Sequence, residues 1–594
     1  TGVANFISTV TNTATLNSLV MMGDVSLSNG TNITTLTLNS GGLILRGVSR
    51  WLLAGTNSYL TTGNPSGELF IHAPNPSSSL DWTVWPIIKD NGATPLVLVK
   101  DGADEVKLGN MSTYTGGTIV NAGILAARSG NAGGNGFAPV GTITPFGSGP
   151  ITVHNGAQLQ FGANPGNAFG EYDYNNNIFA DNAIVYARDG FHHIKGNLDV
   201  AAGGVALGAT YDNKGDGLNA GFAKGLFVDG LLTGSGPLAA QDSGLETVNP
   251  WDSSVVYFTS MAPAAQNTYN GTVTINSWSV QGGSYLYLIG TNALANATIN
   301  VNGDNDTAGG RFGASALLFG SGTSADGLGY ATIGALTGTG NFALQNTKTV
   351  QSGSSLGAGV ALSIGNNNAS TTYAGSMSGS GGIVKIGNGT LTLSAPQTFT
   401  GDTVLSGGSI VLTGGWLSSS NVIVGSGRTL TFTAIGTVST VANKILWGDG
   451  TYNGSVNVSA ASGIAAGTDG TYGTNTITGN LTLASGGLGY FDVTAMASGA
   501  NDRVTVSGTL TANNNVIHLK VPDTSVNLDS TADYVLLSSP NNISGTFATT
   551  PTWDVAPANA AHFSIVTGAK TVSLHYSAIA GPTGIGSATP SPAL

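Results

Sequence analysis

Short segments in which every second residue is β-branched or large and apolar recur along nearly the whole chain. They are separated by Gly, Asn and Ser, and clear examples lie at 35–38, 151–153, 298–301 and 390–393. Alternation with a period of two predicts β-strands that bury one face. No stretch sustains the apolar spacing of a helix between capping residues, so we expect an all-β chain.

The spacing of these segments predicts a solenoid. Between 390 and 432 the apolar centres fall near Leu391, Val404, Val411, Ile423 and Leu430. Each apolar centre lies roughly twenty residues before the next but one, and this interval is the length of one coil in a leucine-rich or β-helical solenoid. Stacked coils about 4.8 Å apart would place aliphatic side chains in one interior column and would satisfy each other's backbone hydrogen bonds.

Length and composition agree with a stacked array. The chain has 594 residues, more than one ordinary core supports, and 90 of them are Gly. Charged residues make up only 8%, but 41% of residues are hydrophobic, so enough apolar surface exists to offset chain entropy. We therefore expect the chain to fold.

Several classes of function are disfavoured by composition. There is no Cys, which excludes disulfides, thiolate metal sites and thiol nucleophiles. The formal charge of −12 with only 18 Lys and Arg argues against nucleic acid as a partner. No apolar run approaches the roughly 18 residues that span a bilayer, so no membrane insertion of this chain is expected. Phosphate-binding loops followed by a helix are missing, and no cofactor is expected.

An aromatic-x-Gly tripeptide marks a second, longer repeat. Such a Gly is interpreted as a coil corner with a positive φ, and the ring is expected to stack beneath the next coil. A ladder of rings that stacks on a ligand is the alternative. The pairs are Tyr114 and Gly116, Tyr269 and Gly271, Tyr373 and Gly375, Phe399 and Gly401, and Tyr452 and Gly454.

Three segments carry a family resemblance. The run 387–394, followed by 397–404 and 408–412, resembles the passenger-associated β-strand repeat of bacterial autotransporters, and similar runs lie at 98–125 and 373–385. The segments 477–483, 501–508, 534–537 and 543–547 look like the closing portion of such passengers. The resemblance implies a right-handed parallel β-helix, export through the general secretory route, and a role in adhesion or cohesion at the bacterial cell surface. A start at Thr1 would suit removal of a signal peptide.

These observations predict four regions. They are an N-terminal cap with the first coils (1–95), a solenoid with passenger-type repeats and insertions (96–455), a closing β region (456–580) and a Pro/Gly/Ser tail (581–594). The tail stands where an autotransporter would have the alternating strands of a transmembrane barrel, so we expect a relative without a barrel. Docking of tails onto neighbouring copies would make the chain a homo-oligomer.

Several other motifs have a plain structural interpretation beside a functional one. The string 353–357 has the spacing of a nucleophile elbow, but it lies in a Gly/Ser-rich stretch and no helix is expected after it. Asp212 with Asp216, and Asp304 with Asp306, are interpreted as turns, with calcium ligands as the alternative. His192 and His193 should point to opposite faces of a strand and pack at the surface. The bulky residues Trp51, Trp82 and Trp85 are expected to cover the first coil, with a sugar platform as the alternative.

The sequence thus predicts a non-catalytic extracellular structural protein. It would be a stiff β-solenoid for adhesion or cohesion that assembles into a fibre through the unpaired edges of its end coils. The alternative is a carbohydrate-binding or polysaccharide-cleaving β-helix that uses an exposed aromatic row and a carboxylate pair. Surface glycans are the partners that this alternative would require.

Overall fold

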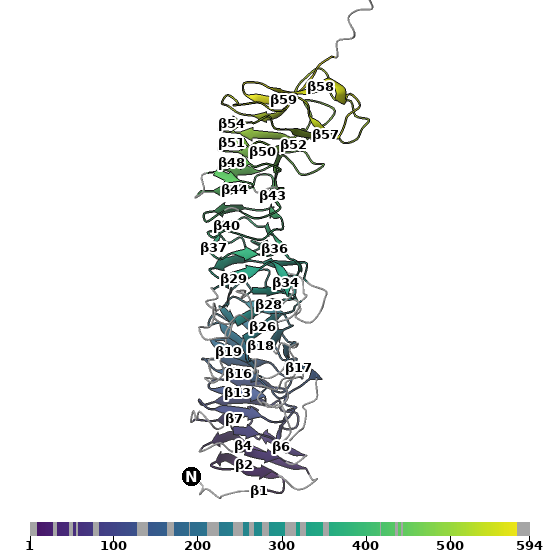
Figure 1. The fold of residues 1–594 in the computed structure, drawn as a ribbon. Coiled ribbons are helices and arrows are strands. Elements are labelled where there is room, and N and C mark those ends of the chain that lie inside the picture. Colours follow the sequence, from purple (N-terminus) through teal and green to yellow (C-terminus); the bar gives the residue numbers. More distant parts are fainter. Residues whose placement is uncertain are drawn as a thin grey trace, which may run out of the picture. The chain divides into compact units, whose positions relative to one another are not determined.

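The computed structural model confirms an all-β chain built from parallel strands (Figure 1). Its one helical element in the described residues is the 3-10 turn η1 (Ala560–His562). The structure describes residues 9–27, 33–46, 51–54, 57–74, 82–127, 141–162, 171–188, 191–210, 225–240, 254–260, 266–275, 284–302, 317–320, 328–347, 356–415, 417–433, 437–440 and 443–578. Within these ranges no helix has the length and apolarity needed to cross a membrane.

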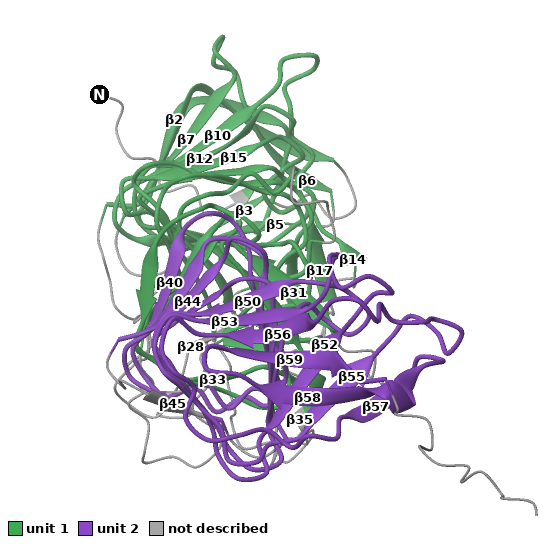
Figure 2. Cartoon of the chain, turned by 90° about the horizontal axis from the view of Figure 1, so that it is seen from above, with its two compact units in different colours: residues 1–382 green, residues 383–594 purple. Residues whose placement is uncertain are grey.

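The chain divides into two compact units, unit 1 (residues 1–382) and unit 2 (residues 383–594), which are coloured separately in Figure 2. Each unit is a stack of coils, and each is described by itself below. The four regions expected from the sequence stay a prediction.

Unit 1 contains three long parallel ladders, in which each strand pairs with the equivalent strand one coil later. The first ladder consists of β1 (Thr9–Val10), β3 (Val25–Leu27), β5 (Trp51–Ala54), β8 (Trp82–Val84), β11 (Glu105–Leu108), β13 (Ile124–Ala127), β16 (Gln158–Phe161), β19 (Ala183–Arg188), β22 (Val205–Thr210), β25 (Leu238–Ala240), β27 (Thr272–Ile275), β29 (Thr298–Val301), β32 (Ala335–Gly338) and β37 (Thr371–Tyr373).

The second ladder of unit 1 starts at its N-terminal coils. It consists of β2 (Ala14–Met21), β4 (Thr34–Leu45), β7 (Glu68–His72), β10 (Val97–Asp101), β12 (Gly117–Val120), β15 (Ile151–His154), β18 (Ile178–Asp181), β21 (Leu198–Val200) and β24 (Leu232–Gly234). The long strand β4 also pairs with β6 (Ser58–Thr62), which continues to β9 (Ile87–Ile88).

The third ladder of unit 1 holds a cluster of charged side chains described below. It consists of β14 (Gly141–Thr142), β17 (Glu171–Tyr174), β20 (Phe191–Ile194), β23 (Gly225–Val228), β26 (Ser254–Phe258), β28 (Ser284–Leu288), β30 (Leu317–Phe319) and β34 (Gln345–Thr347). An antiparallel strand, β35 (Leu356–Gly359), follows β34. Two further parallel pairs are β31 (Tyr330–Ile333) with β36 (Ala361–Ile364), and β33 (Phe342–Ala343) with β38 (Met377–Ser378).

Unit 2 repeats the arrangement with three ladders. The first consists of β40 (Thr390–Leu393), β42 (Ser409–Leu412), β44 (Thr429–Phe432), β47 (Thr451–Asn453), β50 (Thr474–Ile477), β53 (Arg503–Val506) and β56 (Tyr534–Ser538). The second consists of β39 (Gly382–Lys385), β41 (Thr403–Leu405), β43 (Asn421–Val424), β46 (Ile445–Gly448), β49 (Gly463–Ala465), β52 (Leu488–Asp492), β55 (Ile517–Lys520) and β57 (Thr552–Val555). The third consists of β45 (Thr437–Ser439), β48 (Ser455–Val458), β51 (Leu481–Leu483) and β54 (Leu510–Thr511).

The strands of unit 2 surround a column of apolar side chains. In the first ladder the inward-pointing register partners are buried, because alternate residues of each strand point inward. Leu391 pairs with Ile410, and Ile410 pairs with Leu430. The coil length expected from the spacing at 390–432 is therefore confirmed. The column runs through Leu391, Ile410, Leu430, Tyr452, Ile477 and Val506.

Unit 1 has the same kind of interior, but its coils are less regular. The buried column of its first ladder runs through Val106, Leu125, Leu159, Val185, Leu207, Ala240, Ile275 and Val301. The steps along the chain from Leu207 to Ala240 and from Ala240 to Ile275 are much longer than those between partners in the first coils of unit 2. The insertions lie in the connections between strands, so that the register of the interior column is kept.

The last coils of unit 2 end in an antiparallel hairpin. Strands β58 (Phe563–Thr567) and β59 (Thr571–Tyr576) pair with each other, and β59 pairs antiparallel with β56. Leu574 and Ile565 in this hairpin are buried, as are Tyr534 and Leu537 in β56. The hairpin therefore covers backbone groups of the last coil that would otherwise be unpaired.

Candidate functional site

The rings of the aromatic-x-Gly tripeptides lie in the interior of both units. Each of the five rings is at most 1% exposed. The hydroxyl of Tyr269 donates to the carbonyl oxygen of Gly236 at 2.8 Å, and the hydroxyl of Tyr373 makes the equivalent bond to Gly340. The Tyr452 hydroxyl donates to the Val422 carbonyl at 2.8 Å. These hydroxyls tie one coil to the coil before it, and burial raises the pKa of each of the three phenols.

The Gly of the tripeptide is needed for close approach more than for a positive φ. A Cβ on Gly271 would lie 2.4 Å from the Gly236 carbonyl oxygen, and one on Gly116 would lie 2.5 Å from that of Leu96. The same contact at Gly375 involves the Gly340 carbonyl. Gly454 alone among the five has a φ in the left-handed range, at +145°. The expectation of a positive φ therefore holds at one corner, while at three others any side chain would strike the backbone of the previous coil.

Two buried lysines occupy matching places in unit 1 and unit 2. Lys100 is fully buried, and its Nζ donates to the carbonyl oxygens of Gly102 at 2.7 Å, Ala122 at 2.9 Å and Asp101 at 3.1 Å. Lys385 is 1% exposed, and its Nζ donates to the carbonyls of Ile386 and Gly387. Burial lowers the pKa of Lys100 to about 8, against the attraction of Asp101 and Asp104.

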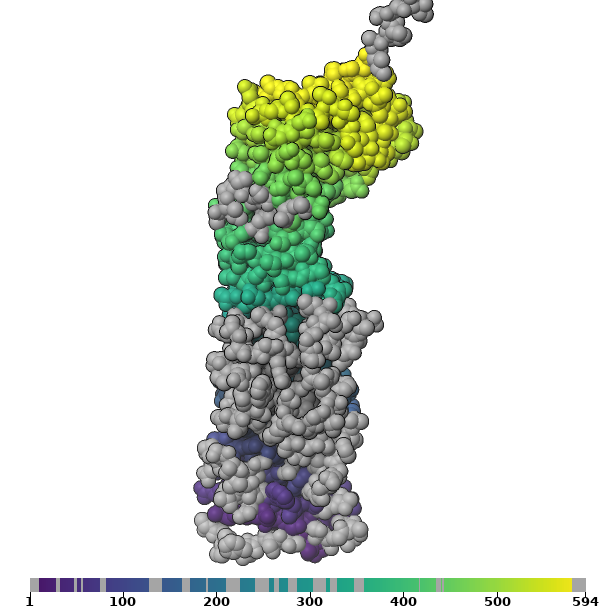
Figure 3. All heavy atoms as spheres, viewed as in Figure 1, coloured from purple at the N-terminus to yellow at the C-terminus, as the bar shows by residue number. Residues whose placement is uncertain are grey.

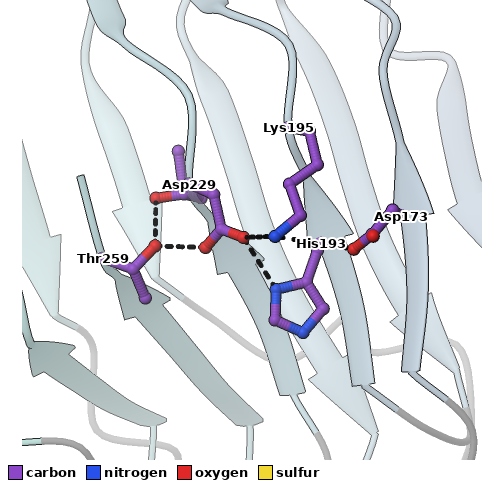
Figure 4. Close-up of polar contacts among 6 residues, drawn as sticks. Asp173, His193, Lys195, Asp229 and Thr259 are labelled. Atoms are coloured by element: carbon purple, nitrogen blue, oxygen red, sulfur yellow. Dashed lines mark hydrogen bonds and ion pairs between the residues drawn. The ribbon is translucent and has the colours of Figure 1, made fainter. Parts of the chain in front are cut away.

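A cluster of charged side chains lies on the outward face of the third ladder of unit 1 (Figure 4). The Asp229 carboxylate contacts His193 Nδ1 at 2.8 Å and Lys195 Nζ at 2.6 Å, and it also accepts a hydrogen bond from the Thr259 hydroxyl. Asp173 lies 3.5 Å from Lys195. Burial alone would raise the pKa of Asp229, but the hydrogen bonds from His193, Lys195 and Thr259 lower it to about 2.

An aromatic row continues from this cluster along the same face. The His193 ring stacks on Phe227 with 4.3 Å between ring centroids, and Phe227 stacks on Tyr257 at 4.2 Å. Tyr257 and Tyr287 follow at 4.8 Å, and both are at most 2% exposed. These rings face away from the interior column, because Leu226 and Leu286 occupy the alternate inward positions. The row is therefore a second aromatic layer outside the sheet, buried at Tyr257 and Tyr287 and partly exposed at His193 and Phe227.

Unit 2 carries a related arrangement of His, Lys and Asp. His518 Nδ1 lies 3.0 Å from an Asp554 oxygen, and Lys520 Nζ lies 2.6 Å from Asp469. The spacing His-x-Lys is shared by His193 with Lys195 and by His518 with Lys520. The rings of Trp447, Tyr490 and His518 on this face are partly exposed, whereas in the unit 1 row His193 and Phe227 are partly exposed and Tyr257 and Tyr287 are buried.

Asp492 and Asp502 form the carboxylate pair of unit 2 that burial perturbs. Asp502 is 2% exposed and accepts the backbone N–H groups of Gly473 and Asp492, each at 2.8 Å. Asp492 accepts the N–H of Gly470 at 2.7 Å. Burial raises the pKa of Asp502 to about 8, although its N–H donors act in the opposite direction. Both carboxylates thus hold the backbone of neighbouring loops.

The remaining sequence motifs differ in burial, and some of them lie outside the described residues. His192 is 1% exposed and lies 3.3 Å from the Tyr174 hydroxyl, so it packs in the interior and not at the surface as expected. Trp82 and Trp85 are buried, whereas Trp51 is 44% exposed. The pairs Asp212 with Asp216 and Asp304 with Asp306, the elbow-like residues 353–355 and the tail 581–594 lie outside the described residues.

Sequence reasoning missed the buried lysines and the Asp229 cluster. A signal for the first was present, because Lys100 and Lys385 occupy the third position of two segments that align without a gap. The partners of Asp229 could not be found in this way, because the insertions of unit 1 hide which residues face each other. Within the described ranges no group of three or more His, Asp or Glu side chains is arranged to hold a metal ion.

Comparison with known proteins identifies the two aligned segments. A model of the passenger-associated-transport-repeat matches residues 98–127 and 383–412. A search of curated proteins finds no match. Among solved structures, the crystal structure of the Haemophilus influenzae Hap adhesin matches with 11% identity and a TM-score of 0.26. The match covers 94% of this chain and 64% of that chain, so this chain spans less than two thirds of the length of that adhesin.

Proposed function

We propose that this chain, a parallel β-helix with two passenger-associated transport repeats, is a non-catalytic protein of the bacterial cell surface or its surroundings that mediates adhesion or cohesion. The observation that carries the proposal is the pair of repeats, each built into an unbroken interior column. Such a stack is rigid and presents regular rows of outward side chains, which suits binding through many repeated contacts. The buried Asp502 and the partly exposed Asp492 support a structural role, since both groups accept backbone N–H bonds.

We further propose that copies of the chain assemble into a fibre through open strand edges. Strand β2 pairs with β4 on one side, and no described strand pairs with its other edge. Val20 and Met22 at this edge are 50% and 63% exposed. In unit 2 the second ladder ends at β57, whose four residues are all at least partly exposed. Unpaired edges with apolar side chains favour pairing with another chain.

Electron microscopy and mass measurement of the purified chain test the fibre. We expect filaments or large oligomers from the natural sequence and single chains from the double variant Val20→Lys with Met22→Lys. A control is Tyr330→Lys, which changes an exposed residue on β31 and should leave assembly unchanged. Uniform particles with the mass of one chain, 59.3 kDa, from the natural sequence would overturn the fibre proposal.

Adhesion is tested separately with beads coated with the purified chain. We expect the beads to bind to each other or to bacterial cells, and we expect beads coated with heat-denatured chain to bind neither. Beads that stay dispersed and bind no cell type in a panel would contradict the adhesive role. Release of new reducing ends from a panel of polysaccharides by the chain would contradict the non-catalytic role.

A further inference from the structure

The second ladder of unit 2 presents a row of partly exposed rings on its outward face. Trp447 in β46, Tyr490 in β52 and His518 in β55 are each intermediate in exposure. Tyr490 and His518 are register partners on neighbouring strands, with 4.9 Å between their ring centroids. Trp447 and Tyr490 are stacked at 6.4 Å with 30° between their planes, although strand β49 lies between them.

Small residues in β49 make this row continuous. The Tyr490 ring lies over Gly463, where an added Cβ would come within 2.5 Å of the ring. Ala465, the register partner of Tyr490, is fully buried on the same face. Because β49 has no bulky outward side chain here, rings from β46 and β52 come together. We call the three rings Trp447, Tyr490 and His518, with the flanking Asp492, Lys520 and Asp554, the aromatic face.

Charged groups border the rings on one side. Asp554 contacts His518 at 3.0 Å and is 45% exposed, while Lys520 is held by Asp469, which is 74% exposed. Tyr472, in the same loop as Asp469, is 37% exposed. Burial and then the negative charge of Asp554 raise the pKa of Tyr490. Three carboxylates, Asp469, Asp492 and Asp554, act on the one ammonium group of Lys520 along this border. The excess of negative charge gives the aromatic face a negative field.

Rings flanked by hydrogen-bonding carboxylates are suited to a sugar chain. Flat rings can cover the apolar C–H faces of pyranose units, while carboxylate oxygens accept hydrogen bonds from hydroxyl or amino groups. The excess of carboxylates repels uronic or sialic acids and attracts amino groups. The described surface of unit 2 that contains these strands is coloured green to yellow in Figure 3.

We propose that the aromatic face binds a glycan with neutral or amino-bearing sugar units, which would make it the adhesive site of the proposed function on which this inference rests. Rings from several coils line up along the stacking direction, so several consecutive sugar units would be engaged at once. The corresponding row in unit 1 offers a shorter surface, because Tyr257 and Tyr287 are buried and only His193 and Phe227 in that row are partly exposed.

Calorimetry of the full chain with defined oligosaccharides tests the proposal. The probes are chitosan hexamers, N-acetylated chitohexaose, cellohexaose and oligogalacturonate of the same length. We expect the chitosan hexamer to bind most tightly, the two neutral hexamers to bind more weakly and oligogalacturonate not to bind. Equal binding of oligogalacturonate, binding of none of the four probes, or binding of polylysine as tight as that of chitosan would overturn the proposal.

Variants then locate the site. Trp447→Ala and Tyr490→Ala should each weaken chitosan binding at least tenfold, and Asp554→Asn should weaken it about threefold without changing the binding of chitohexaose. Trp447→Phe keeps a ring and should retain most of the affinity, which guards against loss of fold in the Ala variants. The matched control Phe179→Ala removes an aromatic ring that is 41% exposed on a ladder of unit 1 and should change nothing.

The outcome for the glycan site is separable from that for the proposed function. If coated beads still adhere while Trp447→Ala and Tyr490→Ala bind every probe as the natural chain does, the aromatic face is not the site and the adhesive role stands. If beads fail to adhere although the natural chain binds the probes and the variants bind them more weakly, the glycan site stands and the adhesive role is contradicted.

Discussion

The two passenger-type repeats, 98–127 in unit 1 and 383–412 in unit 2, use the same backbone with different side-chain bonds. In the first repeat Leu98 pairs with Thr118, and in the second Ile383 pairs with Thr403, so partners are separated by the same interval of sequence in both. The following pair of strands also keeps one interval in both repeats. Gly102 and Gly387 have positive φ, as do Gly123 and Gly408.

The differences lie in how the buried polar groups find partners. The Tyr114 hydroxyl is 2.6 Å from that of Thr118, whereas Phe399 at the matching position has no hydroxyl and Thr403 bonds Ser419 instead, also at 2.6 Å. Lys100 donates to three carbonyls and Lys385 to two. The repeat therefore requires the path of the coil and a buried amine near its corner, and it does not require one particular set of side-chain hydrogen bonds.

The largest effect should come from the glycines that set the shared path. We expect Gly123→Ala and Gly408→Ala each to cost about 3 kcal/mol or more in local opening free energy, because a positive φ and a backbone collision add together. A Cβ would lie 2.4 Å from the Gly102 carbonyl oxygen in the first repeat and 2.2 Å from that of Gly389 in the second. Hydrogen exchange of the adjacent strands measures the cost.

Matched controls isolate the collision from the backbone strain. Gly156 and Gly427 also have positive φ, but a Cβ there would meet nothing within 4 Å. Gly156→Ala and Gly427→Ala should therefore cost only about 1 kcal/mol. Equal losses of stability in all four variants would mean that close stacking of coils is not the reason why positions 123 and 408 require glycine.

The two buried lysines should contribute differently to the stability of their repeats. Lys100→Met leaves three carbonyls without this donor and should cost about 2 kcal/mol, while Lys385→Met affects two and should cost about 1 kcal/mol. The amides of β10 and β39 report the loss by hydrogen exchange. A stabilised Lys100→Met variant would show that desolvation of the amine outweighs its hydrogen bonds.

Swapping Tyr and Phe at the matching positions 114 and 399 tests the difference in hydrogen-bond partners between the two repeats. Tyr114→Phe should cost about 1 kcal/mol, because the Thr118 hydroxyl loses the Tyr114 hydroxyl and keeps only the Phe146 carbonyl as a partner. Phe399→Tyr should cost a similar amount, because the hydroxyl of Thr403 already bonds Ser419. Adding Ser419→Ala to Phe399→Tyr should recover part of the loss, which a double-mutant cycle measures. Strict additivity in that cycle would contradict the assignment of partners.

The smallest effect is a pH dependence of the first repeat. The folded pKa of Lys100, about 8, is below its usual value of 10.5, so the unfolded chain binds more protons between these limits and stability rises with pH there. We expect local stability around β10 to rise by about 1 kcal/mol between pH 7 and pH 9. Lys100→Met should abolish the rise, and an unchanged rise in that variant would assign it to another group.

Much of the fold followed from the sequence, because an alternating pattern repeated every coil leaves few ways to bury its apolar face. Regular coils near Leu391 and Leu430 could be counted directly. Long insertions hid the register of unit 1, so the partners of Asp229 came only from the structure. Whether a ring is interior or outward also depends on the register of its strand, and the outward place of Tyr490, which no aromatic-x-Gly tripeptide marks, came only from the structure.

Coil-on-coil register is the central claim, and the absence of Cys from the natural chain allows a direct test. Thr392 and Val411 are outward register partners on β40 and β42, whereas Thr413 lies further along the chain, just after β42. Under mild oxidation the Thr392→Cys/Val411→Cys chain should form an internal disulfide rapidly and nearly completely, because directly paired residues are within disulfide reach. Preferential bonding in the Thr392→Cys/Thr413→Cys chain, or in neither, would contradict the stacked coil.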